Sequence, residues 1–311
     1  YLNPNNYNYN IMNVLVTGGN GMVASCIKDL QYMYPIDSFF FMTRKECDLS
    51  SEKSVNDFFE NSTIKYDYII HLAAKVGGLF MNLNSNIEMF CENIKINENI
   101  LKACHKYNIK RGIFCLSSCI YPSNPSRFPM DETMIHESPP HPSNEGYAYS
   151  KRMLELQCRQ YNKAYDTEYI CVIPVNLYGP YDNFNIENGH VIPSIMHRFH
   201  KEKFKNKGAF IAYGTGSPLR QFLYAPDFAK IICNILFNKN SKDTEPIICC
   251  NKEITIKEMV HTLSKIMNIN IDKIKWDKTK SDGCLKKTVD NSKLLELYPD
   301  FNFISLQDGL K

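Results

Sequence analysis

The sequence has no run that approaches the roughly 18 apolar residues of a membrane-spanning helix. Its 36 Lys and Arg against 33 Asp and Glu leave a formal net charge of only +3. That imbalance is too small to indicate nucleic acid or an anionic membrane as a partner. Residues 1–10 are an Asn/Tyr tract with neither the basic nor the apolar segment of a secretory signal. We therefore expect no nucleic-acid partner and no membrane association.

Paired C-x-x-C spacings are also missing among the 12 cysteines, so we expect no metal site. A long chain without a secretory signal is expected to keep its thiols reduced, which predicts a cytoplasmic protein. Several cysteines fall in apolar periodic segments, where a reduced thiol acts as a small core residue. These are Cys26, Cys91, Cys104, Cys115, Cys158, Cys171 and Cys233.

Short β-rich runs alternate with helical patterns through residue 178, which predicts an α/β fold with a doubly wound parallel sheet. The expected strands are 14–17, 39–42, 68–72, 113–116 and 169–174. The expected helices are 23–34, 54–60, 87–105, 147–165, 192–203, 226–237 and 256–267. Beyond Tyr178, clusters of Gly, Pro and Asn interrupt the pattern and predict a smaller, irregular region.

A glycine-rich turn, Gly18-Gly19-Asn20-Gly21-Met22-Val23-Ala24, follows the first strand and opens a helix. In that context such a turn is typical of the Rossmann fold, where a pyrophosphate rests on the helix N-terminus. Gly18 and Gly21 supply the tight turn and the close backbone approach, and Ala24 stands where the helix meets the strand. An ordinary strand-to-helix turn is the alternative. We assign residues 12–178 to a dinucleotide-binding domain, 179–311 mainly to a substrate domain with some segments returning to the sheet, and 1–11 to a dispensable extension.

The end of the second strand indicates which nicotinamide cofactor is bound. A carboxylate there binds the ribose hydroxyl of NAD, whereas arginine accommodates the 2′-phosphate of NADP. Here Arg44 and Lys45 come before any acid, so NADPH is favoured. Solvated loop charges are the alternative interpretation.

Tyr147 and Lys151 lie one turn apart on a predicted helix and so share a face. An ammonium beside a phenol is expected to lower the pKa of the phenol and prepare it for proton exchange. Ser117 and Cys119 follow the fourth strand, at the edge where ligands of open α/β sheets bind. Cys119 follows Ser117 by two residues on this strand end, so we expect the two side chains to point the same way. The constellation resembles the extended short-chain dehydrogenase/reductases.

Five further segments narrow the resemblance to the nucleotide-sugar epimerase-reductases of that family. They are 73–78 (AAKVGG), 117–122 (SSCIYP), 174–180 (PVNLYGP), 182–184 (DNF) and 190–193 (HVIP). The resemblance implies a homodimer formed through the two long helices near 87–105 and 153–165. It also implies a GDP-linked 4-keto-6-deoxy sugar as substrate, which is epimerised at C3 and C5 and then reduced at C4 with NADPH.

The resemblance assigns roles to individual residues. It implies Ser117, Tyr147 and Lys151 as the reductase triad, with Cys119 and His190 as the acid/base pair of epimerisation. Asn176 orients the sugar, Arg198 and Arg220 hold the diphosphate, and Lys287 or its neighbour Lys286 closes the site. The cofactor lies against Gly18, Gly21, Met22, Val23, Arg44, Ala73, Lys75, Tyr147 and Lys151. The family often has a basic residue where this chain has Asn20, which weakens the argument for NADP without reversing it.

Two rival hypotheses remain. One is an NAD-dependent nucleotide-sugar 4-epimerase or 4,6-dehydratase, although dehydratases typically carry an acid pair where this chain has Cys119 and Ile120. The other is an inactive relative that binds a dinucleotide as a regulatory module. Such relatives usually lose Tyr or Lys from the pair, and this chain keeps both.

Overall fold

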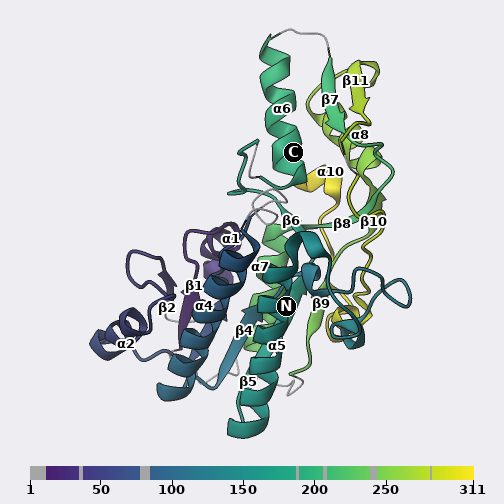
Figure 1. Cartoon of the computed structure of the whole chain (residues 1–311). Helices are drawn as coiled ribbons and strands as arrows, with labels where there is room; N and C mark the ends of the chain where they lie inside the picture. Colours follow the sequence, from purple (N-terminus) through teal and green to yellow (C-terminus); the bar gives the residue numbers. More distant parts are fainter. Residues whose placement is uncertain are drawn as a thin grey trace.

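A six-stranded parallel sheet forms the centre of the larger part of the molecule (Figure 1). The structure is a computed structural model that describes residues 12–34, 38–77, 85–186, 189–205, 209–238, 244–280 and 282–311. The strands lie in the order β2-β1-β3-β4-β5-β9, and each neighbouring pair is parallel. They are β1 Asn13–Thr17, β2 Ser38–Met42, β3 Tyr68–His71, β4 Arg111–Cys115, β5 Glu168–Pro174 and β9 Ile247–Cys249.

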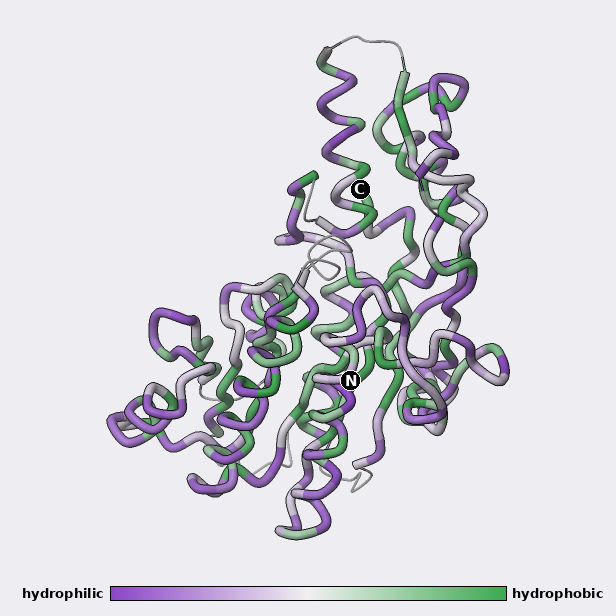
Figure 2. Tube along the Cα trace, viewed as in Figure 1, coloured by the Kyte–Doolittle hydropathy of each residue, from purple (hydrophilic) through white to green (hydrophobic). Residues whose placement is uncertain are grey.

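Apolar residues fill these strands because helices cover both faces of a parallel sheet. Val14, Leu15 and Val16 of β1 are completely buried. The covering helices are α1 Met22–Leu30, α2 Glu52–Asn61, α4 Asn86–Lys106, α5 Glu145–Tyr165 and α7 Ala225–Phe237. Helix α4 packs against α5, and α1 packs against α7. Figure 2 shows apolar segments concentrated in the strands and polar ones along the outer helices.

A second, smaller core lies among the elements of the upper part of Figure 1. Sheet β10-β8-β6 and the pair β11-β7 belong to this part. The elements are β6 Asn176–Tyr178, α6 Val191–Lys205, β7 Phe210–Tyr213, β8 Leu219–Tyr224, β10 Glu253–Thr255, α8 Ile256–Ile266, β11 Ile274–Asp277 and α10 Leu306–Gly309. Helix α9 Ser292–Leu297 packs against β9, and its Leu294 belongs to the larger core. Strand β9 and helix α7 come later in the chain than Tyr178 and yet join the larger core. The domain boundary at 178/179 stays a prediction.

Most expected elements appear within a few residues of their predicted bounds, but two expectations were wrong. The fourth strand ends at Cys115, and residues 118–120 form a short 3-10 turn with Ser117 as its N-cap. Ser117 and Cys119 therefore do not lie on a strand, and the directions of their side chains do not follow the two-residue alternation of a strand. Cys91 is exposed on α4 rather than buried in the core, because the periodic pattern placed it on the solvent side of the helix.

All 12 cysteines lie in the described part of the chain, and none forms a disulfide. Within that part, no helix is both long enough and apolar enough to cross a membrane. The predicted extension 1–11 and Gly78 of the segment 73–78 lie outside the described residues.

Candidate active site

The glycine turn joins β1 to α1 at the carboxyl edge of the sheet. Gly18 has a φ of +73°, and a Cβ on it would lie 3.0 Å from the Ala73 nitrogen. A Cβ on Gly19 would lie 2.6 Å from the Phe41 carbonyl oxygen. Gly21 is the N-cap of α1, and no side chain caps the helix there. The turn thus leaves the first N–H groups of α1 open to an anion, which fits the pyrophosphate of a dinucleotide.

A chain of buried hydrogen bonds connects the strand before this turn to the neighbouring strand and helices. The Thr17 hydroxyl accepts hydrogen bonds from the backbone nitrogens of Leu72 (3.2 Å) and Ala73 (3.1 Å). It therefore donates its proton to Nδ1 of His71, 2.8 Å away. His71 Nε2 then donates to Oδ1 of Asn97 (3.2 Å), since the Asn97 amide nitrogen donates to the Ser150 carbonyl. The chain links β1, β3, α4 and α5 beneath the site.

Burial, followed by the charge of Lys151, lowers the pKa of His71 to about 3. The neutral imidazole can thus accept from Thr17 and donate to Asn97 at any physiological pH. Sequence reasoning missed Thr17, His71 and Asn97. Polar residues inside otherwise apolar strand and helix patterns were the signal that would have found them.

Thr17→Val keeps the shape of the side chain and removes the shared hydroxyl. Two backbone N–H groups and Nδ1 of His71 lose a buried hydrogen-bond partner. The free energy of unfolding should therefore fall by about 2 kcal/mol. Urea denaturation measures this, with Thr262→Val as the control because that hydroxyl is exposed on α8. Equal stability losses in the two variants would contradict the importance of the network.

Tyr147, Ser117 and Cys119 come together at the edge between β4 and α5. The Ser117 hydroxyl is near enough to the Tyr147 phenol to lower its pKa, while Cys119 and Cys115 raise it. The Ser117 oxygen also accepts the backbone N–H of Cys119 at 3.2 Å. The turn that replaced the expected strand end therefore brings the thiol and the hydroxyl to one phenol.

Lys151 lies behind this cluster, one helical turn after Tyr147. Its ammonium is 5.9 Å from the centre of the Tyr147 ring and donates to the Cys115 carbonyl oxygen at 2.7 Å. The side chain is almost completely buried, and burial lowers its pKa.

The pKa of the Tyr147 phenol is raised, not lowered as the Tyr/Lys spacing predicted. Burial is the first cause and the charges of Cys119 and Cys115 follow, while the bond to Ser117 opposes them. Removal from water and the neighbouring thiols penalise the phenolate more than the Ser117 hydroxyl favours it. Tyr147 is therefore a neutral phenol at physiological pH, which is the form that donates a proton.

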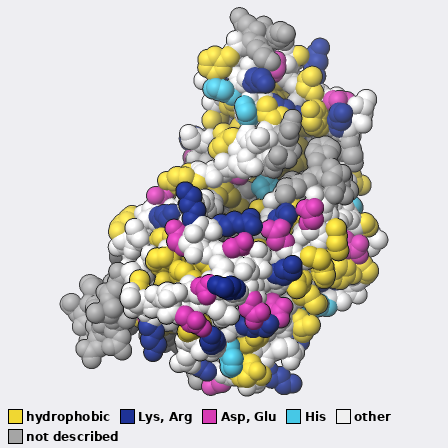
Figure 3. Space-filling view, turned by 60° about the vertical axis from the view of Figure 1, so that its left-hand side comes forward, with side chains coloured by type: hydrophobic (Ala, Val, Ile, Leu, Met, Phe, Trp, Pro, Cys, Tyr) yellow, Lys and Arg dark blue, Asp and Glu magenta, His cyan; other side chains and the backbone are white. Residues whose placement is uncertain are grey.

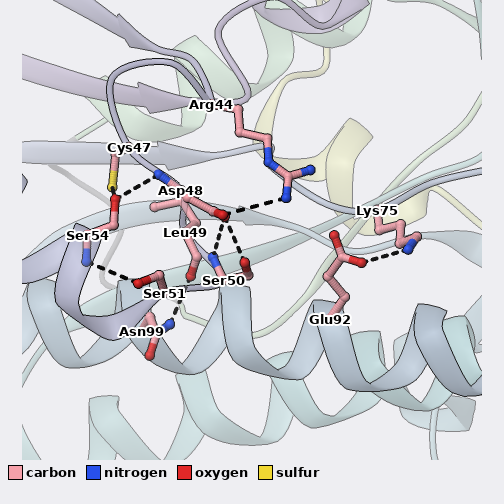
Figure 4. A network of polar contacts seen from close by, with 10 residues as sticks. All are labelled: Arg44, Cys47, Asp48, Leu49, Ser50, Ser51, Ser54, Lys75, Glu92 and Asn99. Atoms are coloured by element: carbon pink, nitrogen blue, oxygen red, sulfur yellow. Dashed lines mark hydrogen bonds and ion pairs between the residues drawn. The ribbon is translucent and has the colours of Figure 1, made fainter.

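Arg44 and Lys75 both carry ion pairs (Figure 4). Arg44 is 3.6 Å from Asp48, and its side chain is 75% exposed. That exposure leaves the guanidinium accessible to a ligand phosphate. The Lys75 ammonium lies 2.6 Å from Glu92 and 3.3 Å from Glu88 of α4. The Lys75 side chain therefore points to α4. Only the backbone of Lys75 lies at the edge of the sheet where the cofactor is predicted to bind.

The residues expected to hold the sugar nucleotide lie mostly in the smaller part. Arg198 stacks over the Tyr213 ring at 4.2 Å, and its Nη1 is buried without a hydrogen-bond partner among the described residues. Arg220 donates to the Leu219 carbonyl, and burial lowers its pKa. Asn176 donates to the Gln221 carbonyl oxygen at 3.0 Å, which ties β6 to β8.

The side chains of the remaining candidate residues make fewer contacts among the described residues. Lys286 places its ammonium 5.3 Å from the Phe128 ring centre, and its neighbour Lys287 is half-buried. His190 is exposed just before α6, and no contact among the described residues joins it to Cys119. No group of three or more His, Cys, Asp or Glu in the described ranges is arranged to hold a metal ion.

Comparison with known proteins places this geometry in a family. Residues 14–250 match the NAD dependent epimerase/dehydratase family. The GDP-L-fucose synthase of Dictyostelium discoideum is 42% identical over 305 residues, covering 96% of this chain and 92% of the relative. The chain belongs to the NAD dependent epimerase/dehydratase family.

Two further relatives place it within that family. The probable GDP-L-fucose synthase of Drosophila melanogaster is 40% identical over 308 residues, which cover 96% of this chain and 94% of that protein. The crystal structure of a GDP-L-fucose synthetase from Naegleria fowleri bound to NADP superposes with a TM-score of 0.87. It is 36% identical and covers 96% of this chain and 91% of its own. The predicted resemblance to the nucleotide-sugar epimerase-reductases and the predicted Rossmann-type fold are confirmed.

Proposed function

We propose that this protein converts GDP-4-keto-6-deoxy-D-mannose to GDP-L-fucose by 3,5-epimerisation and NADPH-dependent reduction of the 4-keto group. The observation that carries the proposal is the convergence of Ser117 and Cys119 on the phenol of Tyr147. One hydroxyl, one neutral phenol and one thiol at the same point suit a carbonyl whose neighbouring carbons exchange protons. The names of the relatives support the same substrate class.

Epimerisation needs a base on one face of each carbon and an acid on the other. The 4-keto group acidifies the protons on C3 and C5, so removal leaves an enolate whose charge rests on O4. Ser117 holds that oxygen, while Cys119 and His190 remove and return the protons. Either member of this pair can serve as base at a given carbon.

Reduction uses the same oxygen. The open N-terminus of α1 would hold NADPH, which would supply the hydride for C4. Tyr147 donates its proton to O4 as the carbonyl becomes an alcohol. Lys151, held by the Cys115 carbonyl, keeps a cation behind the phenol and favours the phenolate that remains. We propose that Asn176, Arg198, Arg220 and Lys287 bind the GDP-sugar.

Arg44→Ala should reduce the preference for NADPH over NADH about tenfold, because one charge-assisted phosphate contact contributes about 1.5–3 kcal/mol. The change also exposes the Asp48 carboxylate, whose pKa is held low by Ser50 and whose charge repels the 2′-phosphate. Isothermal titration with both cofactors measures the ratio. Arg127→Ala is the matched control, since Arg127 also pairs with an aspartate four residues later. Equal affinity of the unmodified protein for the two cofactors would refute the NADPH assignment.

We propose a cytoplasmic homodimer without a nucleic-acid partner. Helices α4 and α5 pack side by side, so each copy would contribute two adjacent helices to the contact. Free thiols throughout suit a reducing compartment. Figure 3 shows basic and acidic side chains interspersed over one face, without the continuous basic field that nucleic acid requires.

The deciding assay follows NADPH absorbance after addition of GDP-4-keto-6-deoxy-D-mannose. Oxidation of NADPH with formation of GDP-L-fucose supports the proposal. Cofactor binding without turnover would indicate the inactive relative. Conversion of a nucleotide sugar with NAD alone would indicate a 4-epimerase or 4,6-dehydratase.

A further inference from the structure

Lys28 reaches back to the glycine turn, although it lies in the last turn of α1. Its ammonium donates to the Gly19 carbonyl oxygen at 2.7 Å. The same ammonium lies 4.9 Å from the centre of the Phe41 ring of β2. Helical side chains tilt towards the N-terminus, so a lysine can extend along α1 in this direction. The positive charge therefore stands where the glycine turn meets the end of β2.

The glycine turn and the end of β2 are in direct contact at this point. The Gly19 N–H donates to the Met42 carbonyl oxygen at 2.8 Å. In Rossmann folds the 2′ group of the adenosine ribose is bound at the end of the second strand, next to the glycine turn. Arg44 follows β2 by two residues. Lys28 is thus a second cation at the strand end where a 2′-phosphate is expected.

The N-terminus of a helix is an unfavourable place for a cation. The helix dipole is positive there and stabilises cations at the opposite end. The Lys28 ammonium nevertheless lies beside Gly19, two residues before the N-cap Gly21. Its two contacts, a carbonyl oxygen and an aromatic ring, carry no net negative charge. The side chain is only half-buried, so an anionic ligand could reach it and offset the unfavourable position.

Arg44 alone leaves a phosphate incompletely neutralised. Asp48 lies 3.6 Å from the Arg44 guanidinium and offsets part of its charge. Asn20, in the glycine turn, carries no charge. A phosphate monoester carries about 1.5 to 2 negative charges at neutral pH. A second cation near the end of β2 would complete the charge balance.

We propose that Lys28 is a cofactor-specificity residue whose ammonium binds the 2′-phosphate of NADPH together with Arg44. The inference rests on the NADPH dependence that is part of the proposed function. The Gly19 carbonyl oxygen takes one N–H of the ammonium, which leaves two for phosphate oxygens. The charge thus comes from α1, whereas the glycine turn itself contributes the uncharged Asn20. NADH has no 2′-phosphate and gains nothing from this cation.

The test is Lys28→Met, which keeps an apolar stem beside Phe41 and removes the charge. We expect isothermal titration to show NADPH binding weakened about tenfold and NADH binding unchanged. Adenosine 2′,5′-bisphosphate should show the same loss as NADPH. Adenosine 5′-monophosphate should show none, because the two fragments differ only in the 2′-phosphate. Lys28→Arg keeps the charge and should recover most of the affinity for NADPH.

Lys203→Met is the matched control. Lys203 also lies on a helix, α6, and its ammonium also donates to a backbone carbonyl oxygen, that of Met267, at 2.8 Å. This variant should bind both cofactors as the unmodified protein does. Equal losses of NADPH and NADH affinity in Lys28→Met would show that Lys28 only supports the turn, and would overturn the inference. An unchanged ratio of the two affinities would overturn it as well.

Lys28→Gln decides the matter if Lys28→Met does not fold, because its amide can still donate to the Gly19 carbonyl oxygen without a charge. It should lose NADPH affinity selectively, and retention of the full preference would contradict the inference.

The titrations contain no sugar, so they separate this inference from the proposed function. If Lys28→Met loses NADPH affinity selectively and the unmodified protein does not convert GDP-4-keto-6-deoxy-D-mannose, the proposed function fails and the inference stands. If the unmodified protein converts this sugar with NADPH and Lys28→Met keeps the full NADPH preference, the inference fails and the proposed function stands. Equal affinity of the unmodified protein for the two cofactors would overturn the inference together with the NADPH assignment.

Discussion

Tyr147→Phe should reduce NADPH oxidation by about a thousandfold, because the variant lacks the only proton that the phenol can give to O4. The ring still fills its site, so the affinity for NADPH should stay nearly the same. Deuterium should continue to enter C3 and C5, since the thiol and the imidazole carry those protons. NADPH absorbance and mass spectrometry in heavy water measure the two steps in parallel.

Tyr149→Phe is the control for this prediction, because Tyr149 lies on the same helix and stacks with Arg152 instead of facing Ser117. It should behave like the unmodified protein. Appreciable NADPH oxidation by Tyr147→Phe would show that another group is the acid. Loss of deuterium exchange together with reduction would show that the phenol is needed to stabilise the enolate.

Cys119→Ala should have the opposite effect. Without the thiol, one face of the sugar loses its proton carrier, and deuterium entry at C3 and C5 should fall by about two to four orders of magnitude. Ser117, Tyr147 and Lys151 keep their positions, because the backbone N–H of Cys119 and not its sulfur binds Ser117. Slow reduction of the unepimerised sugar should therefore remain and yield an off-pathway GDP-6-deoxyhexose.

Cys91→Ala provides the comparison, since that thiol is exposed on α4. It should leave exchange and reduction unchanged. Normal exchange at both carbons in Cys119→Ala would mean that this cysteine is a packing residue. Tyr147→Phe and Cys119→Ala are expected to impair different half-reactions, whereas a general loss of protein stability would impair both.

The polar framework beneath the site was harder to anticipate than the site itself. Gly18, Tyr147 and Lys151 lie in local motifs. A turn pattern was enough to predict the role of Gly18, and a shared helical face was enough to predict that Tyr147 and Lys151 lie together. His71 and Asn97 belong to segments that look like ordinary core, and their partners come from β1 and α5. Local patterns carry no information about which distant segment supplies a hydrogen-bond partner.

The pKa of Tyr147 also depended on contacts that the local sequence does not show. The spacing of Tyr147 and Lys151 predicted a lowered phenol pKa, because a cation one turn away is visible in the sequence. Burial reversed the direction, and burial depends on what the rest of the chain places over a side chain.

The sequence by itself determined the parallel sheet, its helices, the family and the identity of the residues that carry the proposed chemistry. Apolar periodicity and turn residues act over a few positions, and the motifs lie within such short stretches. Tertiary structure alone decided that Ser117 and Cys119 stand on a 3-10 turn, that Lys75 turns to Glu92, and that Tyr147 stays protonated. Those properties depend on contacts and desolvation between segments far apart in the chain, which no local pattern encodes.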